Sequence, residues 1–473
     1  MKTCSHTVRA DYFVSSFRWI LWTALVVGFV GVIGNPVRAD EKMSRPNIVI
    51  ILCDDLGYGD LGCYGNPEIE TPHLDALAND GLLCTSFYAA APVCSPSRAG
   101  LLSGKVPNRL GIVDWIPEGS PMHLHKQERT IASLLSEAGY ETCHVGKWHC
   151  NGHFNSPEQP QPDDHGFAHW FSTQNNSMPT HHNPLNFVRN GAAIGPLAGY
   201  SSTIIVDEAV AWLKSRHERA PKQPYLLCVW FHSPHEVIAT APEFTRRYAD
   251  VMPAEKAEYY GNVTQMDHEV GRLFDALDAF DVSGTPFVLF TSDNGPETLN
   301  RYGPKSSRSY GTAKPLRGMK LHLYEGGIRV PGIFRWPVEI EAGMKTDLPL
   351  CALDLLTTCC RLAGIDPSAV PKNDGSDILP AILGDKTYRR ERPLYWQYDR
   401  AIGTPKVAVR DGDWKLLADA ELNSFELYNL AGDPSETNDV SAAEPEVVVR
   451  MAKFLRDRHA DVLADLAAVN AKP

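Results

Sequence analysis

Short apolar runs alternate with amphipathic segments along most of the chain. The run NIVIILC, Asn47–Cys53, is continuous and rich in β-branched residues, which is typical of a strand buried on both faces of a parallel sheet. Further strands are predicted over Glu141–Val145, Tyr225–Phe231 and Phe287–Asp293. Because helical segments separate these strands, the pattern predicts a doubly wound α/β sheet.

The segments between the strands carry helix signals. In TPHLDALANDG, Thr71 is a candidate N-cap, Pro72 suits the first helical position, and Gly81 ends the helix. The other helices of this part of the chain are predicted over Thr130–Ala138, Thr203–His217 and Ala254–Phe280.

The hydrophobic pattern changes near Glu391. RPLYWQYD, KVAVRDGDWKLL and FELYNL have the alternation of short strands, with a turn at Asp411–Gly412, and a last helix is expected over about Glu444–Leu466. We therefore predict a large domain over residues 40–385 and a small C-terminal α+β domain with an antiparallel sheet over residues 386–473.

The first 39 residues have the pattern of a signal peptide. Basic residues precede the apolar run Trp19–Gly34, and Val37 and Ala39 suit the small-residue rule for cleavage after Ala39. The alternative is an uncleaved membrane anchor, but the run is shorter than the ~20 residues that a spanning helix needs. We expect an exported protein that is periplasmic, secreted or lumenal and has no stable membrane contact after cleavage.

Charge and cysteine content set further bounds. The 473 residues carry a formal net charge of −12, which argues against a nucleic-acid-binding surface but leaves room for a local cationic site that binds an anion. Of the eleven cysteines, ten remain after Cys4 is removed with the signal peptide. The pairs Cys143–Cys150 and Cys53–Cys63 are possible, but the sequence does not assign disulfides.

Polar and ionisable residues follow several of the predicted strands. Ligands of open α/β sheets bind beyond the carboxyl ends of the strands, so these residues form a candidate site. In chain order they are Asp54, Asp55, Lys147, His149, His235, Asp293 and Asn294, with Cys94, Arg98 and Lys320 in the segments between.

This set of residues combines two kinds of chemistry. Its aspartates and Asn294 offer hard oxygen ligands that suit Ca²⁺ or Mg²⁺, although Asp and Asn are also common turn residues after strands. Its basic residues and histidines favour a multiply oxygenated anion as substrate.

Cys94, in APVCSPSRAG, does not fit a hard metal site as a thiol, because sulfur has little affinity for such a metal. An oxygen group at this position would suit the metal better. A buried structural thiol and a catalytic thiolate with His149 or His235 as base are the alternatives.

The segment CSPSR, Cys94–Arg98, matches the C-x-P-x-R modification signature of the formylglycine-dependent sulfatases. From PNIVIILCDDLGYGD to FELYNLAGDPSE the chain resembles this family, which belongs to the alkaline-phosphatase-like superfamily. The resemblance implies a large mixed, mostly parallel sheet flanked by helices, and it makes residues 40–385 the catalytic domain.

The resemblance also implies a cofactor chemistry. A formylglycine-generating enzyme, a transient partner, would oxidise Cys94 to formylglycine (3-oxoalanine), whose hydrate is an oxygen nucleophile. One oxygen of this diol attacks sulfur and releases the alcohol, and the other then expels sulfate. One Ca²⁺ per chain would be held by Asp54, Asp55, the modified Cys94, Asp293 and Asn294.

By the same resemblance, the remaining site residues act on sulfate and on protons. Lys147 and Lys320 would bind sulfate oxygens, and Arg98 would polarise the diol. His149 would help to deprotonate the diol, and His235 would act with Lys320 as general acid at the leaving oxygen.

The polar insertion Phe171–Gly191 predicts a loop at the rim of the site. Its His181, His182 and Asn183 would bind sugar hydroxyls, unless the loop is simply solvated. We expect a sulfated carbohydrate substrate that is hydrolysed at the sulfate ester. The alternatives are a phosphonate monoester or phosphodiester hydrolase with the same nucleophile, and a non-catalytic carbohydrate-binding protein.

Overall fold

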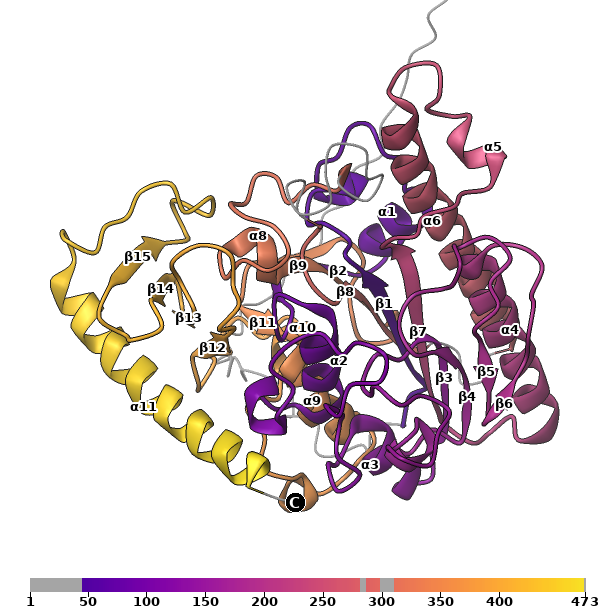
Figure 1. Cartoon of the computed structure of the whole chain (residues 1–473), viewed down its shortest axis with the longest axis horizontal. Coiled ribbons are helices and arrows are strands. Elements are labelled where there is room, and N and C mark those ends of the chain that lie inside the picture. Colours follow the sequence, from indigo (N-terminus) through magenta and orange to yellow (C-terminus); the bar gives the residue numbers. More distant parts are fainter. Residues whose placement is uncertain (1–44, 281–285, 298–309, 472–473) are drawn as a thin grey trace, which may run out of the picture. The chain divides into compact units, whose positions relative to one another are not determined.

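The computed structural model describes residues 45–280, 286–297 and 310–471, and the structural statements below concern these residues. Eleven of their strands form one sheet, in the order β10-β2-β9-β8-β1-β7-β3-β4-β5-β6, with β11 paired to β2 (Figure 1). The strands are β1 (Ile48–Asp54), β2 (Leu82–Tyr88), β3 (Glu141–Lys147), β4 (His169–Thr173), β5 (Val188–Arg189), β6 (Ala192–Ala193), β7 (Tyr225–Pro234), β8 (Phe287–Ser292), β9 (Arg329–Arg335), β10 (Met344–Thr346) and β11 (Leu350–Cys351).

The sheet is mixed but mostly parallel, as the sequence predicts. β1 pairs in parallel with both β7 and β8, so that Ile48 lies opposite Leu226 on one side and Phe287 on the other. β3 pairs in parallel with β7 and β4, whereas β9 runs antiparallel to β2 and β8. All seven residues of β1 are buried, which confirms that both faces of this strand are covered.

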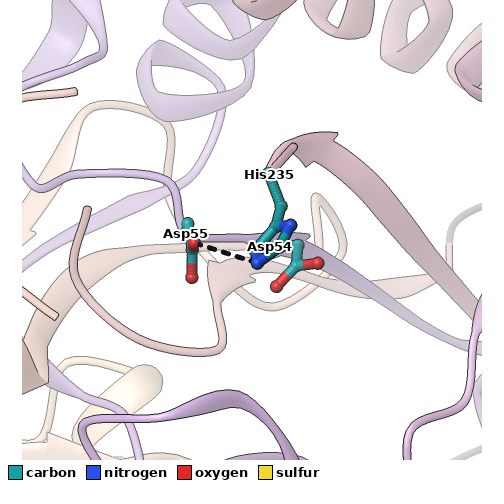
Figure 2. Close-up of side chains that lie close together, drawn as sticks. All are labelled: Asp54, Asp55 and His235. Carbon is teal, nitrogen blue, oxygen red and sulfur yellow. Dashed lines mark ion pairs between the residues drawn. The ribbon is translucent and has the colours of Figure 1, made fainter. Parts of the chain in front are cut away.

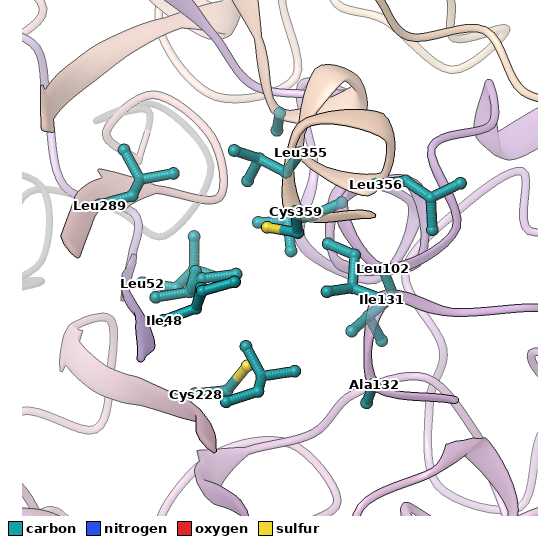
Figure 3. Close-up of a cluster of buried hydrophobic side chains, with 14 of the residues drawn as sticks. Ile48, Leu52, Leu102, Ile131, Ala132, Cys228, Leu289, Leu355, Leu356 and Cys359 are labelled. Atoms are coloured by element: carbon teal, nitrogen blue, oxygen red, sulfur yellow. The ribbon is translucent and has the colours of Figure 1, made fainter. Parts of the chain in front are cut away.

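Helices cover the two faces of the sheet (Figure 1). Val49 and Ile51 of β1 face α1 (Pro72–Asn79), α4 (Ser201–Arg219) and α6 (Ala254–Phe280). Ile48, Ile50 and Leu52 face the opposite layer. That layer contains α2 (Cys94–Ser103), α3 (Ile131–Glu137), α9 (Leu355–Leu362) and α10 (Leu379–Ile382), and Figure 3 shows part of its packing.

The predicted element bounds hold closely, but β3 and β7 are longer than expected. β3 extends to Lys147 and β7 to Pro234, because pairing continues into the polar residues after each apolar run. A register shift between Leu52 and Asp54 of β1 keeps Asp54 paired with Pro234. Both extensions carry the strands up to the predicted site.

The C-terminal part forms a separate antiparallel sheet, as expected. Its strands follow one another in the order β12 (Leu394–Gln397), β13 (Val407–Asp411), β14 (Trp414–Ala418) and β15 (Phe425–Asn429). Asp411 pairs with Trp414 across the predicted turn, and α11 (Pro445–Asn470) packs on β13 and β14. The domain boundary after residue 385 stays a prediction, and the signal peptide lies outside the described residues.

All ten cysteines of the described residues are free thiols. The possible pair Cys143–Cys150 is not formed, because Cys143 packs on the α4–α6 face of the sheet and Cys150 on the α2–α9 face. Cys53 does not pair with Cys63, and its thiol instead contacts the sulfur of Met266 at 3.2 Å. No helix within the described ranges has both the length and the hydrophobicity to cross a bilayer.

A buried ion cluster joins the two sheets. Lys415 of β14 places Nζ 2.9 Å from Glu325 of α8 (Glu325–Ile328) and 2.8 Å from Glu436, and none of these side chains is exposed to more than 1%. Glu325 also accepts a 2.6 Å hydrogen bond from the Tyr88 hydroxyl of β2 and pairs with Arg329 at 3.2 Å. One lysine of the small sheet therefore pairs both with Glu325, next to the large sheet, and with Glu436 of the C-terminal part.

Replacing Lys415 by Met should destabilise the protein strongly. Two buried carboxylates would lose their common cation, which typically costs about 3–5 kcal/mol. Urea unfolding of the native protein and of K415M measures the loss. The matched control is K453M on the exposed face of α11, which should change stability by no more than about 0.5 kcal/mol. Equal effects of the two substitutions would contradict the structural role of Lys415.

Candidate active site

The parallel strands β1, β3, β7 and β8 end at the same edge of the sheet, and the predicted site residues lie there. Three turns at this edge adopt positive φ angles at non-glycine residues: Asp55 (66°), His149 (55°) and Leu321 (69°). This conformation is uncommon for such residues and clusters at functional sites. Gly146 approaches β7 so closely that a Cβ would lie 1.8 Å from the Trp230 carbonyl oxygen, so only glycine fits before Lys147.

Arg98 and Lys147 neutralise two aspartates of this edge. Lys147 Nζ lies 2.6 Å from Asp54 Oδ2. Arg98 reaches Asp293 Oδ2 with Nε at 2.9 Å and Nη2 at 2.6 Å, and Nη2 is 3.5 Å from Asp54 Oδ1. Its other terminal nitrogen donates to the Lys147 carbonyl at 2.9 Å. Arg98 of α2 thus bridges the ends of β1, β3 and β8.

Asp55 forms the second half of the charge cluster. Its Oδ2 lies 2.7 Å from Lys320 Nζ and 3.6 Å from His235 Nε2, and Figure 2 shows His235 directed toward the aspartates. Asn294 donates from Nδ2 to Asp55 Oδ1 at 2.7 Å. Lys320 also pairs with Glu297 at 3.2 Å.

The carboxylates of the cluster differ in their pKa values. Burial raises the pKa of Asp54, but Lys147, His235 and Arg98 outweigh burial and hold this pKa well below its usual range. Lys320 likewise lowers the pKa of Asp55 against the effect of burial. At Asp293 burial dominates over Arg98 and raises the pKa to about 7. Asp293 is therefore the carboxylate that would gain most from a further positive charge.

His235 is neutral in this arrangement. Burial lowers its pKa to about 4, although Asp54 and Asp55 act in the opposite direction. Nδ1 contacts the Glu236 carbonyl at 2.7 Å and must donate to it, so Nε2 carries a lone pair. Two acceptors, His235 Nε2 and Asp55 Oδ2, therefore face each other.

A hard cation fits this set of donors. Asp54, Asp55 and His235 present ligand atoms that lie within 4.8 Å of one another. Two further oxygens, Asp54 Oδ1 and Asn294 Oδ1, are buried without a hydrogen-bond partner among the described residues. Oxygen-rich, carboxylate-containing sets of this kind suit Ca²⁺ and Mg²⁺.

Cys94 is the first residue of α2, close to the charge cluster, and only 4% of it is exposed. Burial raises the pKa of its thiol to about 11, although the positive charges of Lys147 and Lys320 oppose the shift. The thiol is therefore uncharged at neutral pH and is a weak nucleophile as it stands. The start of a ten-residue helix favours negative charge, so an anionic oxygen would be stabilised at the same position.

His149 has the hydrogen bonding of a base. Its Nε2 contacts the Ile116 carbonyl at 3.0 Å and donates to it, which leaves the lone pair on Nδ1. Nδ1 is buried and has no hydrogen-bond partner among the described residues. Burial, with Lys147 and Arg98, holds the pKa of His149 well below its usual range, so the ring is neutral.

Arg98 also packs against a cluster of aromatic rings. The guanidinium lies 5.4 Å from the ring of Trp230, and His144 meets the same ring edge-on at 4.7 Å. His144 Nδ1 contacts the Ser172 hydroxyl at 2.8 Å. Burial, reinforced by Arg98, lowers the pKa of His144 to about 3.

The structure brings most of the predicted site residues into one connected set of contacts. They are Asp54, Asp55, Arg98, Lys147, His235, Asp293, Asn294 and Lys320. Cys94 and His149 lie next to this set, near enough for its charges to shift their pKa values.

Three supporting residues escape sequence reasoning. Glu297 pairs with Lys320, and Ser292 accepts the Leu56 N–H at 3.0 Å and donates to the Asn294 carbonyl at 2.9 Å. Gln174 Nε2 donates to the carbonyls of Ile116 and Asn151. The only sequence signal for Ser292 and Glu297 is that they lie in the same short segment as Asp293, TSDNGPE. The sequence gives no signal for Gln174.

Comparison with known proteins places this site in a family. The model of the family described as Sulfatase matches residues 46–365, more than half of the chain. The chain belongs to the sulfatase family. A second model, described as N-sulphoglucosamine sulphohydrolase, C-terminal, matches residues 319–461 of the sulfatase.

Curated relatives of the sulfatase support the same assignment. N-acetylgalactosamine-6-sulfatase of Sus scrofa is 34% identical over 441 residues, which span 88% of this chain and 78% of the relative. Arylsulfatase A of Homo sapiens is 33% identical over 454 residues, 85% of either chain. The protein is thus a sulfuric ester hydrolase, as the sequence predicts.

Solved structures confirm the fold. The crystal structure of Ps i-CgsB in complex with k-i-k-neocarrahexaose superposes with a TM-score of 0.78 at 27% identity and covers 89% of this chain and 93% of its own. A sulfatase structure from the glycosaminoglycan metabolism of Bacteroides thetaiotaomicron has a TM-score of 0.73 at 26% identity and covers 88% and 99%.

Replacing His144 by Gln should change how the stability of the sulfatase depends on pH. The unfolded chain protonates His144 near pH 6.5, whereas its pKa in the folded state is about 3. Below pH 6.5 the proton binds only to the unfolded state, so the native protein loses stability there as the pH falls. Relative to H144Q, it should lose about 1.4 kcal/mol per pH unit below pH 6. Urea unfolding of both proteins at pH 7, 6 and 5 measures this. A stability difference independent of pH would contradict it.

Proposed function

We propose that this sulfatase removes sulfate from a sulfated carbohydrate and uses formylglycine, made from Cys94, as its nucleophile. The observation that supports this most is the state of Cys94. The residue begins α2 beside Lys147, Lys320 and Asp54, yet burial keeps its own thiol protonated. A cysteine so placed needs conversion to an oxygen group before it can serve as a nucleophile at neutral pH.

One Ca²⁺ would be held by oxygens of Asp54, Asp55, Asp293 and Asn294 together with the modified Cys94. When bound, it would supply positive charge that stabilises an anionic oxygen at residue 94. Asp54 Oδ1 and Asn294 Oδ1, which accept no hydrogen bond among the described residues, support this choice of ligands. His235 borders the same space, with Nε2 toward Asp55.

The chain's own residues divide the remaining work. The hydrate of formylglycine supplies the attacking oxygen, and His149 Nδ1, which is neutral and unpartnered, would take its proton. Lys147 and Lys320 would donate hydrogen bonds to sulfate oxygens, and fixed donors of this kind are strong transition-state stabilisers.

A proton is also needed at the leaving oxygen. Asp55 and Glu297 hold the pKa of Lys320 well above its usual range despite burial, whereas His235 is neutral. Lys320 and His235 would act together as the general acid, and Lys320 would be the member that carries the proton. Arg98 would polarise residue 94 while it holds Asp54 and Asp293 in place.

The carbohydrate part of the proposal rests on the relatives. The Sus scrofa relative is an N-acetylgalactosamine-6-sulfatase, and Ps i-CgsB was crystallised in complex with k-i-k-neocarrahexaose. The phosphonate or phosphodiester hydrolase remains the alternative. Rates on paired sulfate and phosphate esters of one alcohol separate the two activities.

A formylglycine-generating enzyme would be the transient partner. Every residue of α2 is buried in the folded chain, including Cys94, Pro96 and Arg98 of the modification signature. The modifying enzyme must therefore act before this part of the chain folds.

We also propose export through the signal peptide of residues 1–39, because it would bring the sulfatase to extracellular or lumenal sulfated glycans.

The mass of the peptide that contains Cys94 tests the nucleophile. In protein made by its own host, we expect loss of the cysteine sulfur and the appearance of an aldehyde or its hydrate. The unmodified C94A variant, which has no thiol to convert, should not hydrolyse 4-nitrophenyl sulfate. A plain thiol at Cys94 in the native protein would overturn the proposal and favour a non-catalytic carbohydrate-binding role.

Removal of Ca²⁺ should lower both activity and thermal stability. Dialysis against a chelator takes away the charge that balances the buried carboxylates, and added Ca²⁺ should restore both properties. At a Ca²⁺ concentration 100 times its Kd, the gain in stability is about 2.7 kcal/mol. The matched variant D293N, which lacks one proposed ligand charge, should respond to Ca²⁺ more weakly. An equal response of both proteins would argue against this ligand set.

A further inference from the structure

A second group of polar side chains lies behind His235. His181 comes from the insertion between β4 and β5, His232 from the end of β7, and Asn262 from α6. The backbone of His181 is fixed on both sides, because its N–H donates to the Val237 carbonyl at 3.0 Å and its carbonyl accepts the Ser201 N–H at 2.7 Å. The ring therefore has a defined place next to the segment that carries His235.

Each member of this group has a buried polar atom without a partner. Among the described residues, His181 Nε2, His232 Nδ1 and Asn262 Oδ1 make no hydrogen bond, and each is almost completely shielded from solvent. The rings of His181 and His232 are 6.2 Å apart. Buried polar atoms without partners are rare in native proteins and indicate a missing water, ion or ligand.

His181 is near the reacting groups. Burial lowers its pKa to about 3, reinforced by the charges of His235 and Lys147 and opposed by Asp54 and by the neighbouring backbone of His235. Its Nδ1 faces the Asn262 amide nitrogen at 3.5 Å, a donor, so the hydrogen of the neutral ring is on Nε2. The unpartnered atom is therefore an uncharged N–H donor on the His235 side of the site.

The neighbouring candidates of the insertion are engaged elsewhere. The ring of His182 stacks on Tyr200 with centroids 4.6 Å apart, and more than a third of the residue is exposed. Asn183 Oδ1 accepts the Gly199 N–H at 2.9 Å. The structure thus separates three residues that the sequence offers as equal candidates for binding sugar hydroxyls.

We propose that His181 is a specificity-determining residue, whose Nε2–H donates a hydrogen bond to an oxygen substituent on the sugar ring that bears the scissile sulfate. This inference rests on the proposed function. His235 would stand at the leaving oxygen, so a substituent on a neighbouring ring carbon is the part of the sugar within reach of His181. An uncharged donor suits a hydroxyl or an acetamido carbonyl, whereas the charged lysines suit sulfate. A simple aryl sulfate lacks such an oxygen.

The test compares an aryl sulfate with sugar sulfates as substrates of four proteins. 4-Nitrophenyl sulfate reports the sulfate chemistry alone, and a panel of monosulfated galactose and N-acetylgalactosamine isomers identifies the preferred sugar. The proteins are the native sulfatase, H181Q, H181N and the control H182A. The Gln amide nitrogen can approach the position of His Nε2, whereas the shorter Asn side chain cannot.

We expect H181N to lower kcat/KM on the preferred sugar sulfate roughly 10- to 100-fold and to leave 4-nitrophenyl sulfate within about twofold of native. H181Q should retain most of the activity on the sugar, and H182A should match the native protein on both substrates. An equal loss on both substrates in H181N would overturn the proposal and make His181 a structural residue that holds a buried water.

Two further measurements complete the test. Monodeoxy analogues of the preferred sugar should show a large loss at one ring position with the native protein and little loss there with H181N. Absence of any such position in the native protein would refute the contact.

Thermal unfolding should show both His181 variants folded, because Nε2 has no partner within the described protein, and failure of both to fold also counts against the proposal. Lack of turnover of any sulfate ester, including the aryl ester, would instead refute the proposed function.

Discussion

The mutual neutralisation of buried charges at the carboxyl edge of the large sheet is the constraint on which the rest of the structure depends. Four carboxylates there, including Glu297, face three cations, and all seven side chains are buried. Burying one of these ions without a partner would cost several kcal/mol of lost hydration, so the folded state is stable only when the opposite charges are buried together. The strands must therefore keep their register, since a one-residue slip of β3 would turn Lys147 away from Asp54.

The same constraint explains why the C-terminal sheet matters to the site. Lys320 is not at the end of a strand, and backbone contacts hold its segment: the Lys320 N–H donates to the Pro296 carbonyl and the Leu321 N–H to the Pro92 carbonyl. The Leu321 carbonyl in turn accepts the N–H of Ile402 from the C-terminal part. Through this segment, the residues after Asp293, the residues before α2 and the C-terminal part together position the Lys320 cation.

Sequence reasoning succeeds here where local pattern and topology coincide. The apolar run of β1 predicts a central strand, and the rule that ligands bind beyond strand ends collects Asp54, Lys147 and Asp293. It fails where only packing decides. Cys143 and Cys150 are close in sequence but on opposite faces of the sheet. The insertion expected to be irregular begins in β4 and contains β5. His181 and His182 are adjacent residues of the same type, and only tertiary contacts distinguish them, because one ring lies near His232 and the other stacks on Tyr200.

Burial acts on every ionisable group of the site, yet it yields two kinds of side chain. Lys320 stays charged because a carboxylate lies within 2.7 Å, and that interaction outweighs the cost of desolvation. His149 and His181 are neutral because burial lowers their pKa values and no carboxylate pairs with their rings, whose nitrogens meet a carbonyl or an amide. Sulfate ester hydrolysis needs both kinds, cations for the sulfate oxygens and neutral groups for proton transfer and for the uncharged alcohol. In the proposed function, the lysines held charged by carboxylates would contact the sulfate, and the histidines that burial keeps neutral would serve proton transfer and the sugar.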